Sequence, residues 1–259
     1  MSHDSESTAH SETDGAEPRL IDHLIELRAR LLRAVVGLLI VFVALLPFAA
    51  EIYAALAQPL LATLPANGQL VAVDPAGGFF VPMKLAFFAA LLLAMPWLLY
   101  QAWAFVAPGL YHREKRLAMP LLVSAVALFY LGCAFAFFLV LPSVFGFLAR
   151  FTPDVVAMTP DIGKYLDFVL VIFLAFGASF ELPVALVILV LLGWVTPQQL
   201  RESRGYAVVG IFVIAALITP PDVVSQLMLA IPMCVLYELG IVASRWLQPR
   251  PEAGQTPSA

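Results

Sequence analysis

The sequence predicts an all-α integral membrane protein, with six transmembrane helices in a curved, concave bundle whose last two helices are short. Of its 259 residues, 62% are hydrophobic and only 12% are charged, and the mean hydropathy is +0.93. Apolar segments recur along the chain at lengths near the ~20 residues that cross a bilayer as a helix. This composition excludes a soluble protein built around a single apolar core.

Six apolar segments supply the predicted membrane crossings. The first four are expected at about 31–50, 79–100, 117–139 and within 165–195, and the last two at 206–219 and about 223–243. Only the tetrapeptide TPPD is left for the turn between the last two segments, so we expect this hairpin not to cross the bilayer at full thickness. Prolines at six positions within or beside the segments favour bent helices, which suits a concave bundle. They are Pro47, Pro82, Pro96, Pro120, Pro183 and Pro232.

Basic residues predict that both termini lie in the cytoplasm. They gather on alternate connections, whereas the opposite side holds only Arg150 and Lys164. By the positive-inside rule, the side with the basic excess is cytoplasmic. Its basic residues are Arg19, Arg28, Arg30, Arg33, Arg113, Lys115, Arg116, Arg201, Arg204, Arg245 and Arg250.

The two ends of the chain differ in composition from the membrane part. Residues 1–19 are polar and acidic, so we expect a disordered cytoplasmic segment, followed by a transmembrane domain over 20–246 and a disordered tail over 247–259. Both cysteines lie in apolar segments and no histidine lies in a predicted span. Motifs of hydrolases, metalloproteases and nucleotide-binding proteins are absent from the sequence. We therefore expect neither an enzyme nor a metal site or cofactor.

The start of the first helix carries an apolar stripe. Leu24, Leu27, Leu31 and Val35 recur at three- and four-residue spacing, and Glu26 lies off this stripe with the nearby arginines. The pattern predicts a helix that begins along the cytoplasmic interface before it enters the membrane.

Glu181 is the polar residue that most needs an explanation. It stands near the middle of the apolar run from Phe168 to Val195, out of reach of either interface. A carboxylate at that depth is costly unless it is paired, protonated or in a wet cavity, so a functional role is expected. One alternative is a proton-coupled small-solute transporter with Glu181 as the proton carrier. Inverted repeats would favour that alternative, but the two three-helix halves show no evident similarity.

Two further carboxylates, Glu26 and Glu114, belong to the predicted cytoplasmic face. Each could be an ordinary solvated salt-bridge partner. Together they could instead receive a cationic ligand, and arginine fits best because its planar guanidinium bonds a carboxylate bidentately. Asp222 follows two prolines and can cap the sixth helix, with Gln226 one turn further on.

Five segments, in this order and spacing, resemble the signature segments of the TatC family. They read HLIELRARLL, YQAWAFVAPGLYHREKR, FGASFELPVAL, LITPPDVVSQ and AIPMCVLYELG, and the resemblance extends from about Leu20 to Trp246. It implies six transmembrane helices with cytoplasmic termini in the bacterial inner membrane.

The resemblance also implies a function and partners. TatC proteins are receptors for signal peptides with consecutive arginines, and they work with single-span TatA-like and TatB-like subunits to export folded proteins with the proton gradient. Several copies of the chain are expected in the complex, and no nucleic acid is involved. By motif position, Glu26, Arg28, Phe105 and Glu114 are expected to bind the signal peptide, and Glu181 matches the family's intramembrane glutamate. Thr219, Asp222 and Gln226 match the region that contacts the single-span subunits.

Overall fold

The computed structural model describes residues 17–54, 77–106, 115–151, 161–219 and 223–247, and these ranges are helical almost throughout. The predicted disordered ends therefore lie mostly outside the described residues. The chain runs through α1 (Glu17–Leu45), the 3-10 turn η1 (Leu46–Phe48), α3 (Gly77–Val106), α4 (Lys115–Phe135), the π-helical turn η3 (Ala136–Val140), α5 (Leu141–Phe151), α6 (Ile162–Phe180), α7 (Leu182–Leu191), α8 (Pro197–Glu202), α9 (Arg204–Ile218) and α10 (Val223–Leu247).

Five of the helical stretches are long and apolar enough to cross a membrane, and α9 is a shorter apolar helix. The prediction of an all-α, multi-pass membrane protein is thus confirmed. One detail differs: the sixth helix was expected to be short, but α10 has 25 residues. Its apolar pattern was expected to end near Ala243, and the helix continues for one more turn through Arg245 and Trp246, both exposed.

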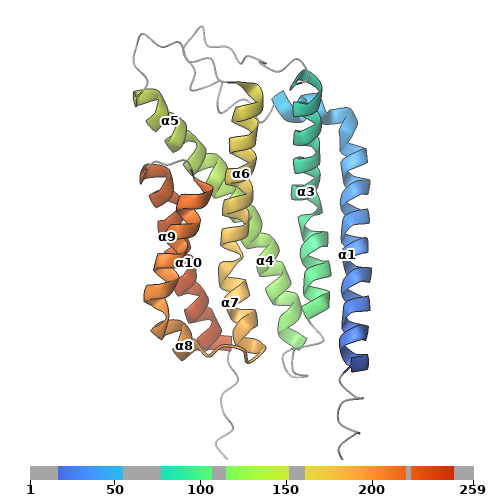
Figure 1. Ribbon diagram of the computed structural model, residues 1–259, viewed down its shortest axis with the longest axis vertical. Helices are drawn as coiled ribbons and strands as arrows, with labels where there is room; N and C mark the ends of the chain where they lie inside the picture. Colours follow the sequence, from blue (N-terminus) through green and yellow to red (C-terminus); the bar gives the residue numbers. More distant parts are fainter. Residues whose placement is uncertain (1–16, 55–76, 107–114, 152–160, 220–222, 248–259) are drawn as a thin grey trace, which may run out of the picture.

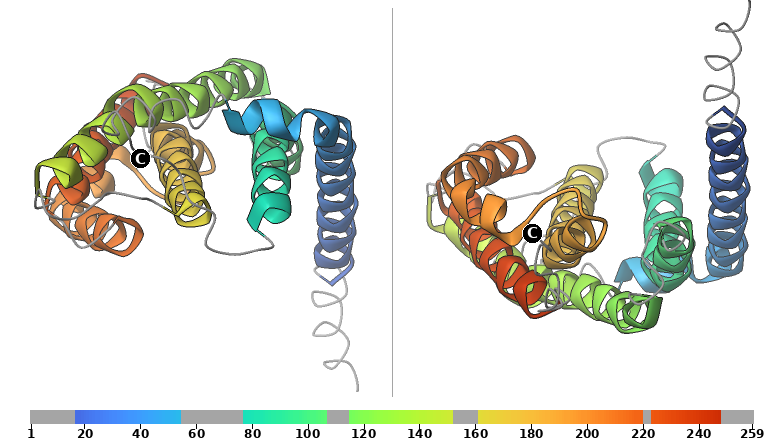
Figure 2. Two further views of the ribbon diagram at one scale, coloured as in Figure 1. Left: turned by 90° about the horizontal axis from the view of Figure 1, so that it is seen from above. Right: turned by 90° about the horizontal axis from the view of Figure 1, so that it is seen from below.

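The helices form a curved row. Figure 2 shows α1 at one edge beside α3, with α6 and α7 near the middle and α9 and α10 at the other edge. The segment α4–η3–α5 runs obliquely along this row, as Figure 1 shows. The π-helical turn stands where α4 passes into α5, just before Pro142, a residue that cannot continue a regular hydrogen-bond ladder.

Close contacts between α4 and α6 hold the centre of the row together. A Cβ atom on Gly132 would lie 2.6 Å from the Phe176 carbonyl oxygen, and one on Gly177 would lie 2.6 Å from the Phe129 ring. Each helix thus presents a glycine to an aromatic residue of the other, and both aromatic side chains are fully buried. Small residues of this kind let membrane helices approach closely, so that packing holds them together.

The exposed side of α1 is the apolar stripe. Leu24, Leu31 and Val35 are exposed, whereas Glu26 and Arg30 are half-buried. Because α1 packs chiefly on α3, the side with Glu26 and Arg30 faces the protein, whereas Leu24, Leu31 and Val35 face outward. The helix is also continuous from Glu17 to Leu45, so no break separates an interfacial part from a spanning part.

Candidate functional site

The first predicted site residue, Glu26, is paired within its own helix. Its Oε1 atom accepts hydrogen bonds from the Arg30 Nε and Nη2 atoms at 2.9 and 2.6 Å. The Glu26 side chain is 35% exposed and the Arg30 side chain 21%. One carboxylate oxygen thus binds a guanidinium, while Oε2 has no such bond among the described residues. Arg28, on another side of the helix, is exposed.

Phe105 lies in the last turn of α3, beside the helix that carries Glu26, and its side chain is half-buried. The beginning of α1 and the end of α3 point to the same end of the molecule, the lower one in Figure 1. The structure therefore brings the regions of Glu26 and Phe105 to one end of two neighbouring helices. Glu114 lies outside the described residues.

Glu181 stands at a break in the membrane crossing. It ends α6 and begins α7, and Pro183 follows within the first turn of α7. The Glu181 backbone remains bonded, because its N–H donates to the Ala178 carbonyl and its own carbonyl accepts from Ala185 N–H. The side chain is half-buried, and its Oε1 atom is buried with no hydrogen-bond partner among the described residues. Such an atom can bond a polar group that enters the site.

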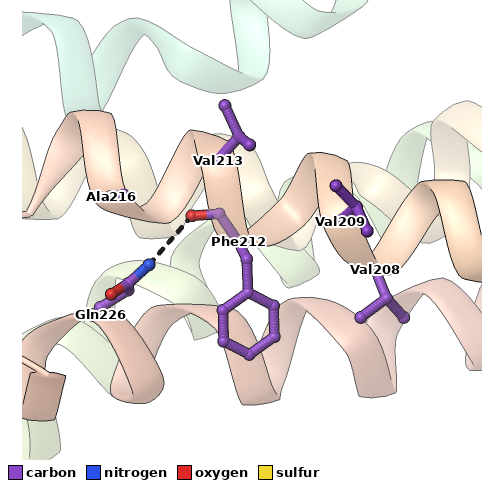
Figure 3. A pocket seen from close by; sticks show the side chains of 6 residues that line it. All are labelled: Val208, Val209, Phe212, Val213, Ala216 and Gln226. Atoms are coloured by element: carbon purple, nitrogen blue, oxygen red, sulfur yellow. Dashed lines mark hydrogen bonds between the residues drawn. The ribbon is translucent and has the colours of Figure 1, made fainter.

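A shallow groove lies between α9 and α10, where the resemblance predicted a partner contact. Val208, Val209, Phe212, Val213 and Ala216 of α9 line it, and Gln226 of α10 is its polar residue. Figure 3 shows the Gln226 amide pointing at α9, where Nε2 donates to the Phe212 carbonyl at 3.2 Å. Gln226 therefore ties the hairpin together, and its amide oxygen can still accept a bond.

The other two residues predicted for this surface differ from Gln226. Thr219 is only 6% exposed, and its hydroxyl donates to the Ala215 carbonyl at 2.7 Å. Its polar atom therefore points back at its own helix. Asp222 lies outside the described residues.

Sequence reasoning missed the polar contacts between helices. Lys84 and Asp167 form an ion pair at 2.5 Å between α3 and α6. Lys84 and Asp167 lie at similar distances from the starts of α3 and α6, and both helices begin at the same end of the molecule. This similarity was the signal in the sequence that could have predicted the pair. Arg204 pairs with Glu238 at 2.5 Å between α9 and α10. The indole of Trp97 donates to the Arg33 carbonyl at 3.1 Å, which joins α3 to α1.

Comparison with known proteins agrees with the resemblance. Residues 22–232 match the family model of the Sec-independent protein translocase protein TatC. The chain is 50% identical to a Sec-independent protein translocase protein TatC of Azotobacter chroococcum, over 97% of this chain and 99% of that protein. It is also 50% identical to the protein of the same description from Escherichia coli K12, over 88% of each chain.

Solved structures give the same result at the level of the fold. A crystal structure of the twin-arginine translocase receptor TatC superimposes with a TM-score of 0.76 at 38% sequence identity, over 86% of this chain and 98% of that one. A second crystal structure of such a receptor, in DDM, gives a TM-score of 0.77 at 37% identity.

Proposed function

Because this chain belongs to the TatC family, a family of translocase components rather than enzymes, we propose that it is the signal-peptide receptor and scaffold of a twin-arginine translocase. It binds signal peptides with consecutive arginines, assembles with TatA-like and TatB-like single-span subunits, and exports folded proteins with the proton gradient. Several copies of the chain take part in the complex, which lies in the bacterial inner membrane. The protein identified as a twin-arginine translocase receptor shares this fold.

The Glu26 carboxylate is the observation that best supports arginine recognition. It is already bonded to a guanidinium through Oε1 alone, so its geometry suits arginine and Oε2 can accept from a second one. Its 35% exposure leaves it within reach of a peptide from the aqueous side. We assign Arg28, Phe105 and Glu114 to the same peptide site.

The distribution of basic residues supports cytoplasmic termini. The start of α1, the corner between α8 and α9, and the end of α10 lie at the lower end in Figure 1. These parts carry Arg28, Arg201, Arg204 and Arg245, whereas Lys164 lies near the opposite end, in the first turn of α6. The positive-inside rule then places the lower end in the cytoplasm.

The groove between α9 and α10 is the proposed contact for a single-span subunit. It offers the apolar surface of α9, a helix that is short for a membrane crossing, and one polar residue, Gln226 of α10. In lipid, a polar side chain gains from a hydrogen-bonding partner on a neighbouring helix. We assign the direct contact to Gln226 and, outside the described residues, Asp222. Thr219 supports this surface from within.

Replacing Glu26 or Glu114 with alanine tests arginine recognition. We expect each change to weaken binding of a twin-arginine peptide by about tenfold, because one charge-assisted hydrogen bond contributes roughly 1.5–3 kcal/mol and the Glu26 site is partly exposed. Affinity for the twin-lysine version should change less. The measurement is fluorescence titration of the purified chain with both peptides.

Glu202→Ala is the matched control, because Glu202 is an exposed carboxylate at the same end of the molecule, in α8. Equal affinity of the native chain for both peptides would contradict the receptor function, and it is what a small-solute transporter predicts. Native affinity in both glutamate variants would remove these carboxylates from the site.

A further inference from the structure

The position of the first helix depends on one neighbour. Within Leu24–Ala54, no residue of the most apolar stretch is fully buried, and α1 packs chiefly on α3. Figure 2 shows α1 at the edge of the row, next to α3. Whatever fixes α1 on α3 therefore also fixes where the residues at the start of α1 lie.

A glycine and a tryptophan make the closest contact between these helices. A Cβ atom on Gly37 would lie 2.4 Å from Nε1 and 2.7 Å from Cδ1 of Trp97, so only a glycine lets the indole approach this far. The same Nε1 atom donates to the Arg33 carbonyl at 3.1 Å, one turn before Gly37. Trp97 thus bonds the α1 backbone itself, at one particular turn. We call Gly37, Arg33 and Trp97 the indole seat.

A second contact prevents rotation about the seat. Phe42 of α1 and Phe87 of α3 form a T-shaped contact, with ring centroids 5.5 Å apart and planes at 80°. Two contacts at different heights determine both the register and the direction of α1 on α3.

The seat is aligned with Glu26. Gly37 follows Glu26 by 11 residues, which places the two residues on the same side of the helix to within about 20° and about 16 Å apart along it. The half-buried residues Glu26, Arg30, Ala34 and Gly37 mark this side. A slip of one residue would rotate Glu26 by about 100° away from α3.

We propose that Trp97 is a positioning residue for arginine recognition: seated on Gly37 and bonded to the Arg33 carbonyl, it holds Glu26 of α1 at a fixed place relative to the end of α3. The recognition part of this inference rests on the proposed function, whereas the positioning part stands on the helix contacts alone. Trp97 itself does not touch the peptide.

Spin labels measure the positioning part directly. In a full-length background with Cys133→Ala and Cys234→Ala, labels at positions 27 and 102, both exposed, report the distance between the start of α1 and the end of α3. We expect one narrow distribution for the native seat. Gly37→Ala should shift or broaden this distribution, because a Cβ 2.4 Å from the indole lies 1.0 Å inside the 3.4 Å at which ordinary contact begins. Trp97→Leu should do the same, because it removes the hydrogen bond to the Arg33 carbonyl.

Peptide titration of the unlabelled variants measures the consequence. Both single variants should bind a twin-arginine peptide roughly threefold to tenfold more weakly, which corresponds to the loss of about one hydrogen bond, and should discriminate less against the twin-lysine version. In the Trp97→Leu background, Gly37→Ala should add no further loss, because the clashing indole is gone. Gly146→Ala is the control, since a Cβ there meets nothing within 4 Å.

Three results would overturn the inference. They are native distances in both single variants, native peptide affinity in both single variants, or an equal effect of Gly37→Ala in the native chain and in the Trp97→Leu variant. A purely structural tryptophan would lower the amount of folded protein without changing the ratio of the two peptide affinities. If the native chain does not distinguish the two peptides, the proposed function fails, and the distance measurement still decides whether Trp97 positions α1.

Discussion

At the scale of single residues, Glu181 combines features that are costly in a membrane. It interrupts the crossing between α6 and α7, and its buried Oε1 atom lacks a partner among the described residues. A buried polar atom left unsatisfied costs roughly 1–3 kcal/mol. We propose that the side chain serves as a hydrogen-bonding group for a polar side chain or water that enters during assembly or transport.

We expect Glu181→Gln to retain most export activity, because an amide keeps a donor and an acceptor at a similar size. Glu181→Ala should lose more, since the incoming group then has no partner at this site. The measurement is export of a folded reporter at equal membrane abundance of the variants.

Native cells treated with a protonophore give the level of export without a proton gradient. Export that continues in these cells would contradict the proposed energy source.

An inactive glutamine variant would contradict this assignment. An amide does not titrate, so loss of export in both variants would identify Glu181 as a proton carrier. That result would favour the small-solute transporter alternative, in which Glu181 carries the proton.

At the scale of elements, α9 is the helix least able to span a bilayer alone. Its 15 residues extend about 22 Å, compared with a hydrocarbon core of about 30 Å. The structure ties it to α10 through the Gln226–Phe212 hydrogen bond and the Arg204–Glu238 ion pair. The hairpin is therefore held at both ends, and local thinning of the membrane or a covering partner helix would accommodate its length.

A photo-crosslinking residue at position 213 or 226 should capture a single-span subunit of the translocase. Val213 lines the groove and is 62% exposed; Val123 of α4, also 62% exposed, is the matched control position. Gln226→Leu should reduce capture from position 213 about threefold, because one interhelical hydrogen bond in a membrane is worth about 0.6 kcal/mol on average. Capture from position 123 equal to that from position 213, with the partners present, would show that the groove is not a specific contact.

At the scale of the whole molecule, basic residues are unevenly distributed along the direction of the helices. The arginines of α1, α8, α9 and α10 lie toward the lower end of the helices in Figure 1, whereas Lys84 and Lys164 lie toward the upper end. This asymmetry of Lys and Arg residues is the basis for the proposed orientation.

Single cysteines should confirm that orientation. In the background without native cysteines, Lys164→Cys should react with a membrane-impermeant maleimide added outside spheroplasts, whereas Arg201→Cys should react only after lysis. Both side chains are exposed, so accessibility depends on the side of the membrane. Labelling of position 201 in intact spheroplasts would invert the proposed topology.

The sequence alone determined the membrane class, the approximate positions of the apolar helices and the place of Glu181 within an apolar run. These properties depend on local hydrophobicity and on the count of basic residues in each connection, which can be read along the chain without knowledge of its neighbours. The spacing of five segments also identified the family. The length of α10 was underestimated, because the helix continues past Ala243, the last residue of the predicted segment, to Leu247.

Only the tertiary structure decided which side chains meet. Lys84 pairs with Asp167, and Trp97 packs on Gly37, although the partners in each pair are far apart in the sequence. Glu26 lies on the inward side of α1, whereas the more obvious sequence pattern of that helix is its exposed apolar stripe. In lipid, an apolar stripe need not face the protein, because the surrounding hydrocarbon is as apolar as the core. Hydrophobic periodicity therefore locates a membrane helix but does not orient it, and close packing and hydrogen bonds between helices decide which side faces inward.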